Sequence, residues 1–256
     1  VCHDASFEDE DAALFFEEAH PGATALRAQT PESLYAELKE RRIALDAVVS
    51  NDVFPNTPCP IEDVAIETLR ASFEALLVFP FKLTQLLVPG MKQRKKGCFV
   101  FVTSARYLQP EFGFSVATSI RSGTTFFALA LAKEVASYGI QVNVLAPNYL
   151  YSEAYYPRAR FVDDLEGREH IRSKVPMGRL GDPEEAGELV AFLVSGRSTF
   201  TTGQVINFTG GWAGFAFGLL TAICLTARYA FVGACWLIYK TSGDLQHQAV
   251  RWAKAG

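Results

Sequence analysis

Three positions in the stretch "VTSARYLQPEFGFSVATSIRSG", residues 102–123, have a type and spacing that could serve catalysis. Ser104 follows an apolar run and offers a hydroxyl that can hold a substrate oxygen. Arg121 lies in the helical pattern that follows, where its guanidinium can favour a nearby negative charge. Between them, where one chemistry would use a tyrosine, the chain has Ala117. The alternatives are a turn or capping role for Ser104 and a surface salt bridge for Arg121.

The elements around this stretch predict an α/β fold with a doubly wound parallel sheet. Short apolar runs alternate with helical patterns, which is typical of βαβ units. The runs "GCFVFVTSA" and "LDAVVSND" predict buried strands. Thr30 and Asp182 are expected N-caps, and Pro80 is expected to bend a long helical segment. The predicted strands lie at 1–4, 23–29, 45–52, 97–105, 140–147 and 202–211, and the predicted helices at 5–22, 30–42, 61–91, 119–139 and 182–196.

Composition excludes several classes of function. A net charge of −4 at pH 7 and an isoelectric point near 5.7 argue against a general nucleic-acid binder. The basic run "KQRKKG" at 92–97 is expected to be a solvated helix end. The five cysteines and four histidines show no metal-ligand spacing, so we expect reduced thiols, a cytoplasmic location and no metal. The start "VCHD" carries no targeting signal and is typical of a chain entered partway through a domain.

The character of the chain changes after residue 211. Residues 213–239 are apolar with one charge, Arg228, and a helix of this length could cross the ~30 Å hydrocarbon core of a bilayer. We therefore expect a domain at 1–211 and a hydrophobic C-terminal helix within an extension at 212–256, with a candidate transmembrane helix at 213–239. An oligomer-interface helix and foreign sequence from a gene-model error are the alternatives. If the helix spans, the basic residues after it favour a cytoplasmic C-terminus.

The order of several motifs resembles the short-chain dehydrogenase/reductase superfamily over residues 1–211. "LDAVVSND" stands where that family has a strand end like "DVLVNNAG", "FVFVTSA" matches the strand that ends in the catalytic serine, and "IQVNVLAPNYL" matches "IRVNAIAPG". "GRLGDPEEAGELVAFLVSG" and "TGQVINFTGG" match the closing segments. The resemblance implies a Rossmann-like sheet. The chain departs from a reductase at Asn148, where the family has glycine, at Leu76, where many members have asparagine, and at Arg121, where lysine is usual.

Those departures resemble the halohydrin dehalogenases, a cofactor-free branch of the same superfamily. "CHDASF", "VVSNDVF", "EALLVFPF", "VTSA" and "APNYL" are all similar to that family. The resemblance implies conversion of vicinal haloalcohols to epoxides and halide without NAD(P) or metal. In the family, Ser, Tyr and Arg follow the spacing Ser-x12-Tyr-x3-Arg. The two hydroxyls hold the alcohol oxygen, the guanidinium favours the tyrosinate that acts as base, and the alkoxide displaces a halide lying where nicotinamide would be.

The resemblance assigns roles to particular residues of this chain. The catalytic positions are Ser104, Arg121 and Ala117, the last being the place of the missing tyrosine, and the halide or substrate site comprises Pro147, Asn148, Tyr149 and Leu150. Without the base, the standard mechanism should lose at least ~10²–10⁴-fold in rate. Tyr107, Tyr149 and Tyr151 are candidates to replace it, although Tyr149 is expected to fill a pocket instead. The implied partners are a small haloalcohol or epoxide, halide, and further copies of the chain through helices at 61–87 and 119–138.

A complete domain of this type begins with a strand, a Gly-rich turn and a helix ahead of the strand ending in "CHD". In the usual strand order that first strand is central. We expect the sheet here to lack this first βα unit and to leave two strand edges without partners. No GxGxxG turn is present to hold a dinucleotide, and Asp4, placed like the ribose-binding acid of reductases, is expected to cap a helix. An NAD(P)-dependent short-chain oxidoreductase and a degenerate, non-catalytic membrane-associated protein are the alternative functions.

Overall fold

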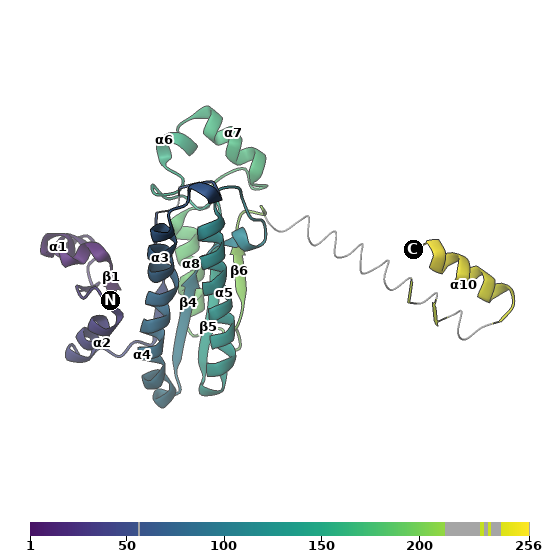
Figure 1. The fold of residues 1–256 in the computed structure, drawn as a ribbon. Helices are drawn as coiled ribbons and strands as arrows, with labels where there is room; N and C mark the ends of the chain where they lie inside the picture. The colour runs from purple at the N-terminus through teal and green to yellow at the C-terminus, as the bar shows by residue number, and fades with distance from the viewer. Residues whose placement is uncertain (56, 213–230, 233–234, 237–241, 256) are drawn as a thin grey trace. The chain divides into compact units, whose positions relative to one another are not determined.

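The computed structural model describes residues 1–55, 57–212, 231–232, 235–236 and 242–255. The chain falls into two compact units, Val1–Gly210 and Gly211–Gly256, each described by itself (Figure 1). In the second unit the described helix is α10 (Asp244–Ala255). Most of the candidate transmembrane helix at 213–239 lies outside the described residues, so it stays a prediction.

The first unit is built on a parallel sheet, as the alternation of apolar runs and helices predicted. Four strands pair in the order β3-β4-β5-β6, and every pairing is parallel. The valines at the centre of β4 and β5, such as Val100, Val142 and Val144, have no exposed surface. Both strands are therefore covered on both faces, which confirms the α/β class. The strands are β3 (Ala47–Ser50), β4 (Gly97–Val102), β5 (Ile140–Pro147) and β6 (Val205–Phe208).

Helices cover the two faces of this sheet (Figure 1). On β4, Cys98 and Val100 pack with Leu193 of α8. The alternate residue Phe101 turns to the other face, where its ring meets Phe127 of α5 with centroids 5.6 Å apart. This division follows from the alternation of side chains along a strand. The helices of the first unit are α1 (Glu10–Ala19), α2 (Pro31–Glu40), α3 (Ile66–Phe73), α4 (Phe79–Arg94), α5 (Ser115–Val135), α6 (Arg158–Phe161), α7 (Leu165–Lys174) and α8 (Pro183–Val194), with short 3-10 turns at Ala5–Glu8, Ile61–Asp63, Ala105–Tyr107 and Ala136–Tyr138.

The first two strands form a separate sheet. β1 (Cys2–His3) pairs in parallel with β2 (Ala25–Leu26), and no strand among the described residues joins β1 to β3. The prediction that "LDAVVSND" is a buried strand is therefore wrong: β3 is an edge strand, and Val49 is 44% exposed. Among the described residues β3 pairs with β4 alone, so its outer edge has no partner, as expected for a sheet without the first βα unit, and the Val49 side chain meets solvent.

The long helical segment at 66–94 is interrupted, but by a π-helical turn at Glu74–Val78 that precedes Pro80. Pro80 lacks the N–H that would bond to the carbonyl of Leu76 four residues earlier. That carbonyl instead accepts a hydrogen bond from Oγ1 of Thr124 on α5, at 2.8 Å. The proline and the neighbouring helix therefore explain the change in helical pitch.

Among the described residues, the same segment, Ile66–Arg94, is the one helix whose length and apolar composition would suffice to cross a membrane. Core helices of globular domains meet this criterion as well, and here the segment contacts α2 and α5. The finding therefore carries little weight for a membrane location.

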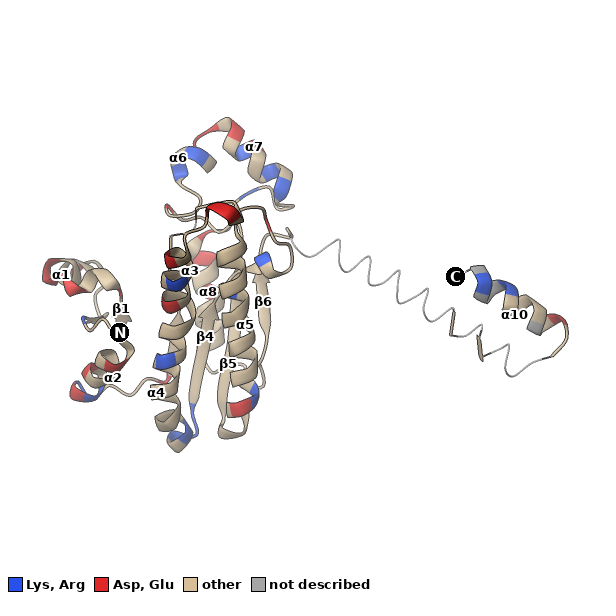
Figure 2. Ribbon diagram, viewed as in Figure 1, with Lys and Arg blue, Asp and Glu red and all other residues tan. Residues whose placement is uncertain are grey.

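Helix ends follow the expected signals. The Thr30 hydroxyl accepts from the Ser33 N–H at 3.1 Å, and the Ser33 hydroxyl accepts from the Thr30 N–H at 3.0 Å, which forms a capping box at α2. Asp182 occupies the N-cap position of α8. The basic run at 92–97 ends α4, with Lys95 in the left-handed conformation as C-cap (Figure 2). The basic run therefore lies at the end of a helix, as predicted.

Replacing Thr30 by Ala should lower the free energy of unfolding by about 1 kcal/mol, because the Ser33 N–H at the start of α2 loses its side-chain partner. Urea denaturation of the purified chain measures this difference. Thr30→Ser keeps the hydroxyl and serves as the matched control, with stability close to that of the parent. Equal loss in both variants would contradict the capping role.

Candidate active site

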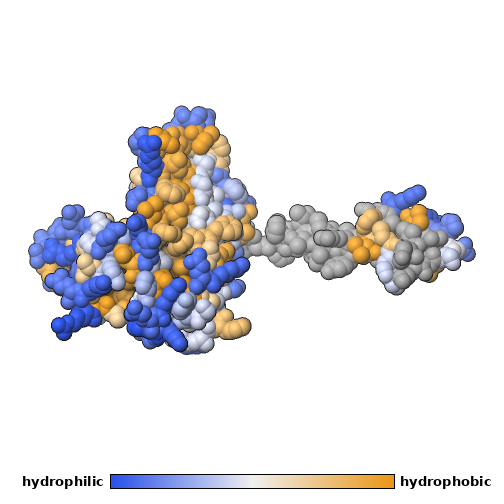
Figure 3. All heavy atoms as spheres, turned by 60° about the horizontal axis from the view of Figure 1, so that its bottom comes forward, coloured by the Kyte–Doolittle hydropathy of each residue, from blue (hydrophilic) through white to orange (hydrophobic). Residues whose placement is uncertain are grey.

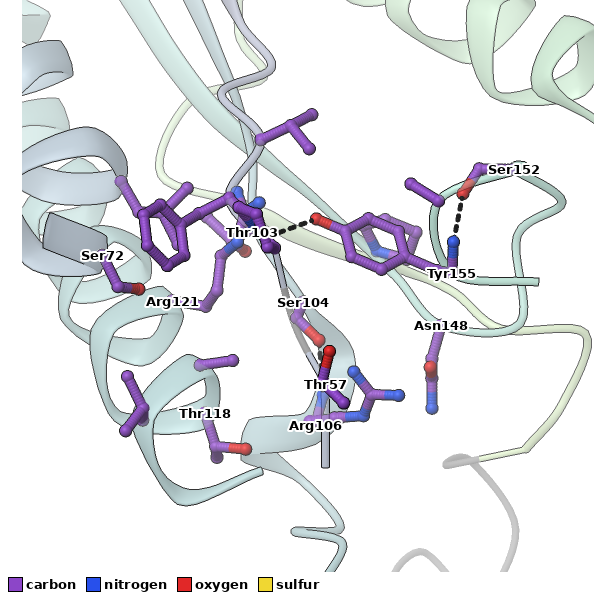
Figure 4. A pocket seen from close by; sticks show the side chains of 18 of the residues that line it. Thr57, Ser72, Thr103, Ser104, Arg106, Thr118, Arg121, Asn148, Ser152 and Tyr155 are labelled. Atoms are coloured by element: carbon purple, nitrogen blue, oxygen red, sulfur yellow. Dashed lines mark hydrogen bonds between the residues drawn. The ribbon is translucent and has the colours of Figure 1, made fainter. Parts of the chain in front are cut away.

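A cavity of about 740 Å³ opens at the carboxyl ends of β4 and β5 (Figure 4). Ligands commonly bind at this edge of an open α/β sheet. The cavity is lined by residues from the segment after β3, from α5 and from the tyrosine-rich loop after β5. Its walls include all seven positions selected from the sequence: Ser104, Ala117, Arg121, Pro147, Asn148, Tyr149 and Leu150.

Ser104 follows β4 and begins the short 3-10 turn at Ala105–Tyr107. Its Oγ accepts a hydrogen bond from the Arg106 N–H at 3.2 Å. The capping alternative and the cavity position therefore coexist, because the hydroxyl that caps the turn also lines the cavity. A serine hydroxyl has a second lone pair and a proton left for a ligand oxygen.

Arg121 makes no surface salt bridge, so that alternative is wrong. Its guanidinium donates to the carbonyl oxygen of Val102 at 2.9 Å and to that of Asp52 at 2.7 Å. Burial lowers the pKa of Arg121, while interactions with the Tyr155 hydroxyl and the Asp52 carboxylate act in the opposite direction. The cation is thus fixed by main-chain oxygens on two sides and lines the cavity.

Asp52, the last residue of the "LDAVVSND" segment, is a charged neighbour of Arg121. Its carboxylate accepts a hydrogen bond from the Ser50 hydroxyl. Burial raises the pKa of Asp52, and the Ser50 hydrogen bond and the Arg121 charge offset only part of that effect. The position next to Arg121 could not be seen in the sequence, since the two residues lie on elements far apart in the chain.

Ala117 lies one helical turn before Arg121 on α5 and contributes only a methyl group to the cavity. The tyrosines considered as substitutes bond elsewhere. Tyr107 donates to Asn207 Oδ1 at 3.2 Å, Tyr149 to Glu111 Oε1 at 3.3 Å, and Tyr151 to Glu153 Oε1 at 2.5 Å. Tyr107 is not among the cavity-lining residues.

Tyr155 is the residue near Arg121 that sequence reasoning missed. Its hydroxyl donates to the Phe54 carbonyl oxygen at 3.1 Å and interacts electrostatically with Arg121. The available signal was the tyrosine-rich loop "PNYLYSEAYYP", but no spacing rule places that side chain across the cavity. Its position depends on how the loop folds back over the sheet.

The segment from Pro147 to Leu150 leaves a polar group pointing to the cavity. The Asn148 N–H donates to the Phe208 carbonyl at 3.1 Å, and Asn148 Oδ1 accepts from the Tyr156 hydroxyl at 3.1 Å. Asn148 is 6% exposed, and its buried Nδ2 has no hydrogen-bond partner among the described residues. A buried donor without a partner is unfavourable, so this amide is suited to a ligand that accepts hydrogen bonds.

Tyr149 is held in a special conformation beside that amide. It has a φ of +55°, in the left-handed region, and is 4% exposed. Burial and the nearby Glu111 carboxylate raise the pKa of Tyr149, so the phenol stays protonated at neutral pH. Tyr149 therefore fills space and cannot serve as a base. Leu150 forms an isolated bridge with Gly181, which ties this segment to the start of α8.

The described residues do not fit a dinucleotide or a metal ion. The Asp4 carboxylate accepts from the N–H and the hydroxyl of Ser6 at 2.8 and 2.6 Å, so it caps a turn as expected. No Gly-rich phosphate-binding turn occurs in the sequence. Within the part of the chain that the structure describes, no group of three or more His, Cys, Asp or Glu side chains could hold a metal.

A family model described as Enoyl-(Acyl carrier protein) reductase matches residues 25–213. The chain belongs to the short-chain dehydrogenase/reductase superfamily.

Several curated relatives are described as reductases or oxidoreductases. The chain is 29% identical over 192 residues to the 3-oxoacyl-[acyl-carrier-protein] reductase FabG of Vibrio cholerae, which covers 73% of this chain and 75% of that protein. It is 34% identical over 158 residues to the uncharacterized oxidoreductase YmfI of Bacillus subtilis, covering 59% of this chain. The chain spans 61% of the length of the Bacillus protein and 51% of the FabG protein of Thermotoga maritima.

Two solved structures that are 36% identical to this chain are described as dehalogenases. A halohydrin dehalogenase (HheC) bound to ethyl (2S)-oxiran-2-ylacetate is 36% identical, with a TM-score of 0.79, and the match covers 83% of this chain and 86% of that one. A second structure described as a dehalogenation enzyme is also 36% identical, with a TM-score of 0.77, covering 82% of this chain and 86% of that one. A Brucella melitensis 3-oxoacyl-[acyl-carrier protein] reductase with bound NAD is 22% identical, which shows the fold alone.

Asp52→Asn should have a free energy of unfolding that increases relative to that of the parent as the pH rises. Burial raises the pKa of Asp52 above its ordinary value of 3.8. The stability linked to this group is therefore fully present below the unfolded pKa and is lost as pH rises through the folded pKa. Asn has no such dependence, so the variant gains relative stability between acid and neutral pH, which denaturation at a series of pH values measures.

Asp46→Asn is the matched control, for which the stability relative to the parent should change with pH in the opposite direction. The Lys96 ammonium, which donates to Asp46 at 2.7 Å, lowers the pKa of Asp46 below 3.8. Its stability contribution is present above the unfolded pKa and is lost as pH falls, so this variant should lose relative stability toward neutral pH. A pH-independent difference for Asp52→Asn would contradict the burial of its charge.

Proposed function

We propose that this chain is halohydrin dehalogenase-like and converts vicinal haloalcohols to epoxides with release of halide, without NAD(P). The observation that carries the proposal is the buried Asn148 amide without a partner at the cavity wall. Ser104 and Arg121 line the same cavity. The 36% identity to a halohydrin dehalogenase that binds an epoxide supports the same assignment.

The halide site would lie against Asn148. An N–H donor in a site shielded from water stabilises an anion more strongly than the same donor in solvent. The Asn148 Oδ1 is already engaged by the Tyr156 hydroxyl, which orients the amide so that Nδ2 is the group left for the anion. Tyr149 beside it takes up volume that a nicotinamide ring would need.

The reaction uses the polar groups at the other side of the cavity. Ser104 would hold the substrate hydroxyl, and Arg121 would stabilise negative charge on the proton acceptor. The alkoxide displaces the halide from the adjacent carbon within one molecule, so fixing the reacting atoms in line supplies much of the rate. The halide leaves toward Asn148, where a hydrogen-bond donor awaits the developing charge. The substrate class is thus a small haloalcohol in one direction and an epoxide in the other.

An NAD(P)-dependent short-chain oxidoreductase is the second candidate function. It is favoured by the reductase family model and by curated relatives such as FabG. The side chains of Asn148 and Tyr149, in place of a small residue after the proline, argue against it. Cofactor titration followed by the near-ultraviolet absorbance of reduced nicotinamide distinguishes the two, because only the reductase oxidises or reduces the ring.

We further propose a cytoplasmic homo-oligomer, with anchoring through residues 213–239 as the alternative location. Large apolar side chains are exposed on α3, α4 and α5, including Phe73, Phe81 and Phe126, and apolar residues reach the surface of the first unit (Figure 3). Exposed apolar area of this kind is common at subunit interfaces. Sedimentation of the chain tests this, and a monomer at all concentrations would exclude it. If neither the parent nor the Ala117→Tyr variant releases halide, a non-catalytic membrane-associated protein is the remaining candidate function.

Replacing Ala117 by Tyr should raise the rate of halide release from a small dichloropropanol by about 10²-fold or more, because it adds a base one turn before Arg121. Ala117→Phe adds the same ring without the hydroxyl and is the matched control. A gain in both variants would mean that packing, and not proton transfer, limits the rate. Release by neither the parent nor the Tyr variant would contradict the proposed function.

Replacing Asn148 by Asp should weaken bromide binding by at least about tenfold, equivalent to ~1.4 kcal/mol, because a carboxylate repels the anion that the amide would bind. Quenching of intrinsic fluorescence by bromide measures the affinity. Asn207→Asp, at an exposed position on β6 that does not line the cavity, introduces the same charge and should leave bromide binding unchanged. Equal effects of the two substitutions would place the halide elsewhere.

A further inference from the structure

We propose that Tyr155 is the proton-transfer residue of the haloalcohol reaction and takes the place of the tyrosine that position 117 lacks. The inference rests on the proposed function, because it names the group that performs the proton transfer of that reaction. It requires that the Tyr155 hydroxyl lie beside Arg121 and within the same cavity as Ser104.

The loop after β5 carries Tyr155 into the cavity. The Tyr155 N–H donates to Ser152 Oγ at 3.1 Å, which closes a turn within the loop. From this turn the ring extends across the cavity toward the side where Arg121 lies (Figure 4). Tyr155 lines the cavity together with Ser104, Ala117 and Arg121.

Two hydrogen bonds to one short segment bring the phenol and the guanidinium together. Tyr155 Oη donates to the Phe54 carbonyl at 3.1 Å, and Arg121 Nη2 donates to the Asp52 carbonyl at 2.7 Å. The two acceptors are only two residues apart in the chain. The Tyr155 hydroxyl lies close enough to Arg121 for the two groups to interact electrostatically, so any negative charge on the phenol oxygen faces a fixed cation.

The other tyrosines around the cavity lie away from Arg121, and Tyr156 lies instead near the Arg106 cation. The hydroxyls of Tyr149 and Tyr151 donate to carboxylates, Glu111 and Glu153, whose charge opposes ionisation of a phenol. Tyr156 donates to the Asn148 amide, and burial raises its pKa. Tyr155 is therefore the cavity tyrosine whose hydroxyl interacts with the Arg121 cation.

The proposed step balances in both directions. For ring closure, the Tyr155 phenolate takes the proton of the substrate hydroxyl. The resulting alkoxide forms a bond to the neighbouring carbon as the carbon–halogen bond breaks, and the bonding pair leaves with the halide. Tyr155 then returns its proton to water. No oxidant, reductant or further reactant is needed.

Ring opening uses the protonated form that the structure contains. The Tyr155 O–H already points at an oxygen acceptor, the Phe54 carbonyl, at hydrogen-bond distance. An epoxide oxygen that replaces this carbonyl would receive the proton as halide attacks the ring carbon. Because the same group serves both directions, the phenol must act as acid in one and as base in the other.

Four variants test the proposal through halide release from a dichloropropanol: Tyr155→Phe, Ala117→Tyr, the double variant, and Tyr107→Phe. We expect Tyr155→Phe to lose at least about 10²-fold in kcat, because only the proton-transferring oxygen is removed. The double variant, with a tyrosine at 117 and phenylalanine at 155, should recover at least the parent rate. Tyr107→Phe, whose hydroxyl lies outside the cavity, should match the parent. Circular dichroism verifies that each variant is folded.

The remaining outcomes separate this inference from the proposed function. Parent-like activity of Tyr155→Phe would overturn the role of Tyr155 and leave the dehalogenase assignment intact. An inactive parent together with an active Ala117→Tyr variant would have the same two consequences. An active Ala117→Tyr combined with an inactive double variant would make Tyr155 structural and also overturn the role. Release by none of the folded variants would overturn both the proposed function and the inference.

Discussion

The cavity depends on how one buried cation, the Arg121 guanidinium, is held. Removing a charge from water is unfavourable unless hydrogen bonds and an opposite charge compensate it. Here the carbonyls of Val102 and Asp52 accept from it, and the Asp52 carboxylate lies nearby. These contacts join α5 to the ends of two adjacent strands, so the same interactions that satisfy the guanidinium also hold three walls of the cavity in place.

The two-sheet arrangement has a direct consequence for that site. Asp52 and Phe54 follow β3, whose outer edge has no partner strand among the described residues. Within this part of the chain, the wall that holds Arg121 and Tyr155 is supported by β4 on one side only. A partner strand at that edge would supply the second support, since the edge of a sheet presents backbone groups that can pair with another strand.

The fold and the cavity point to different relatives because they reflect different parts of the chain. The sheet and its flanking helices are shared by the whole superfamily, so both reductases and dehalogenases match them, and fold alone does not assign a reaction. The loop from Asn148 to Tyr156 is one place where the chain departs from a reductase. In that loop the Asn148 amide lacks a partner among the described residues, a feature that a glycine at this position could not provide, and Tyr155 reaches the same cavity as Arg121.

The sequence by itself determined the parallel α/β class, the N-cap at Thr30 and the helix-ending basic run, and its resemblance to a known family selected the positions Ser104, Arg121 and 147–150 that line one cavity. These follow from local patterns: periodicity, cap residues and ordered motifs act over a few residues, and strand ends of parallel sheets meet at one edge. Only the tertiary structure decided that Arg121 binds main-chain carbonyls and that Tyr155 lies in the same cavity. Those facts depend on contacts between residues as far apart as Phe54 and Tyr155, and no local pattern encodes how a loop of that length folds back across the sheet.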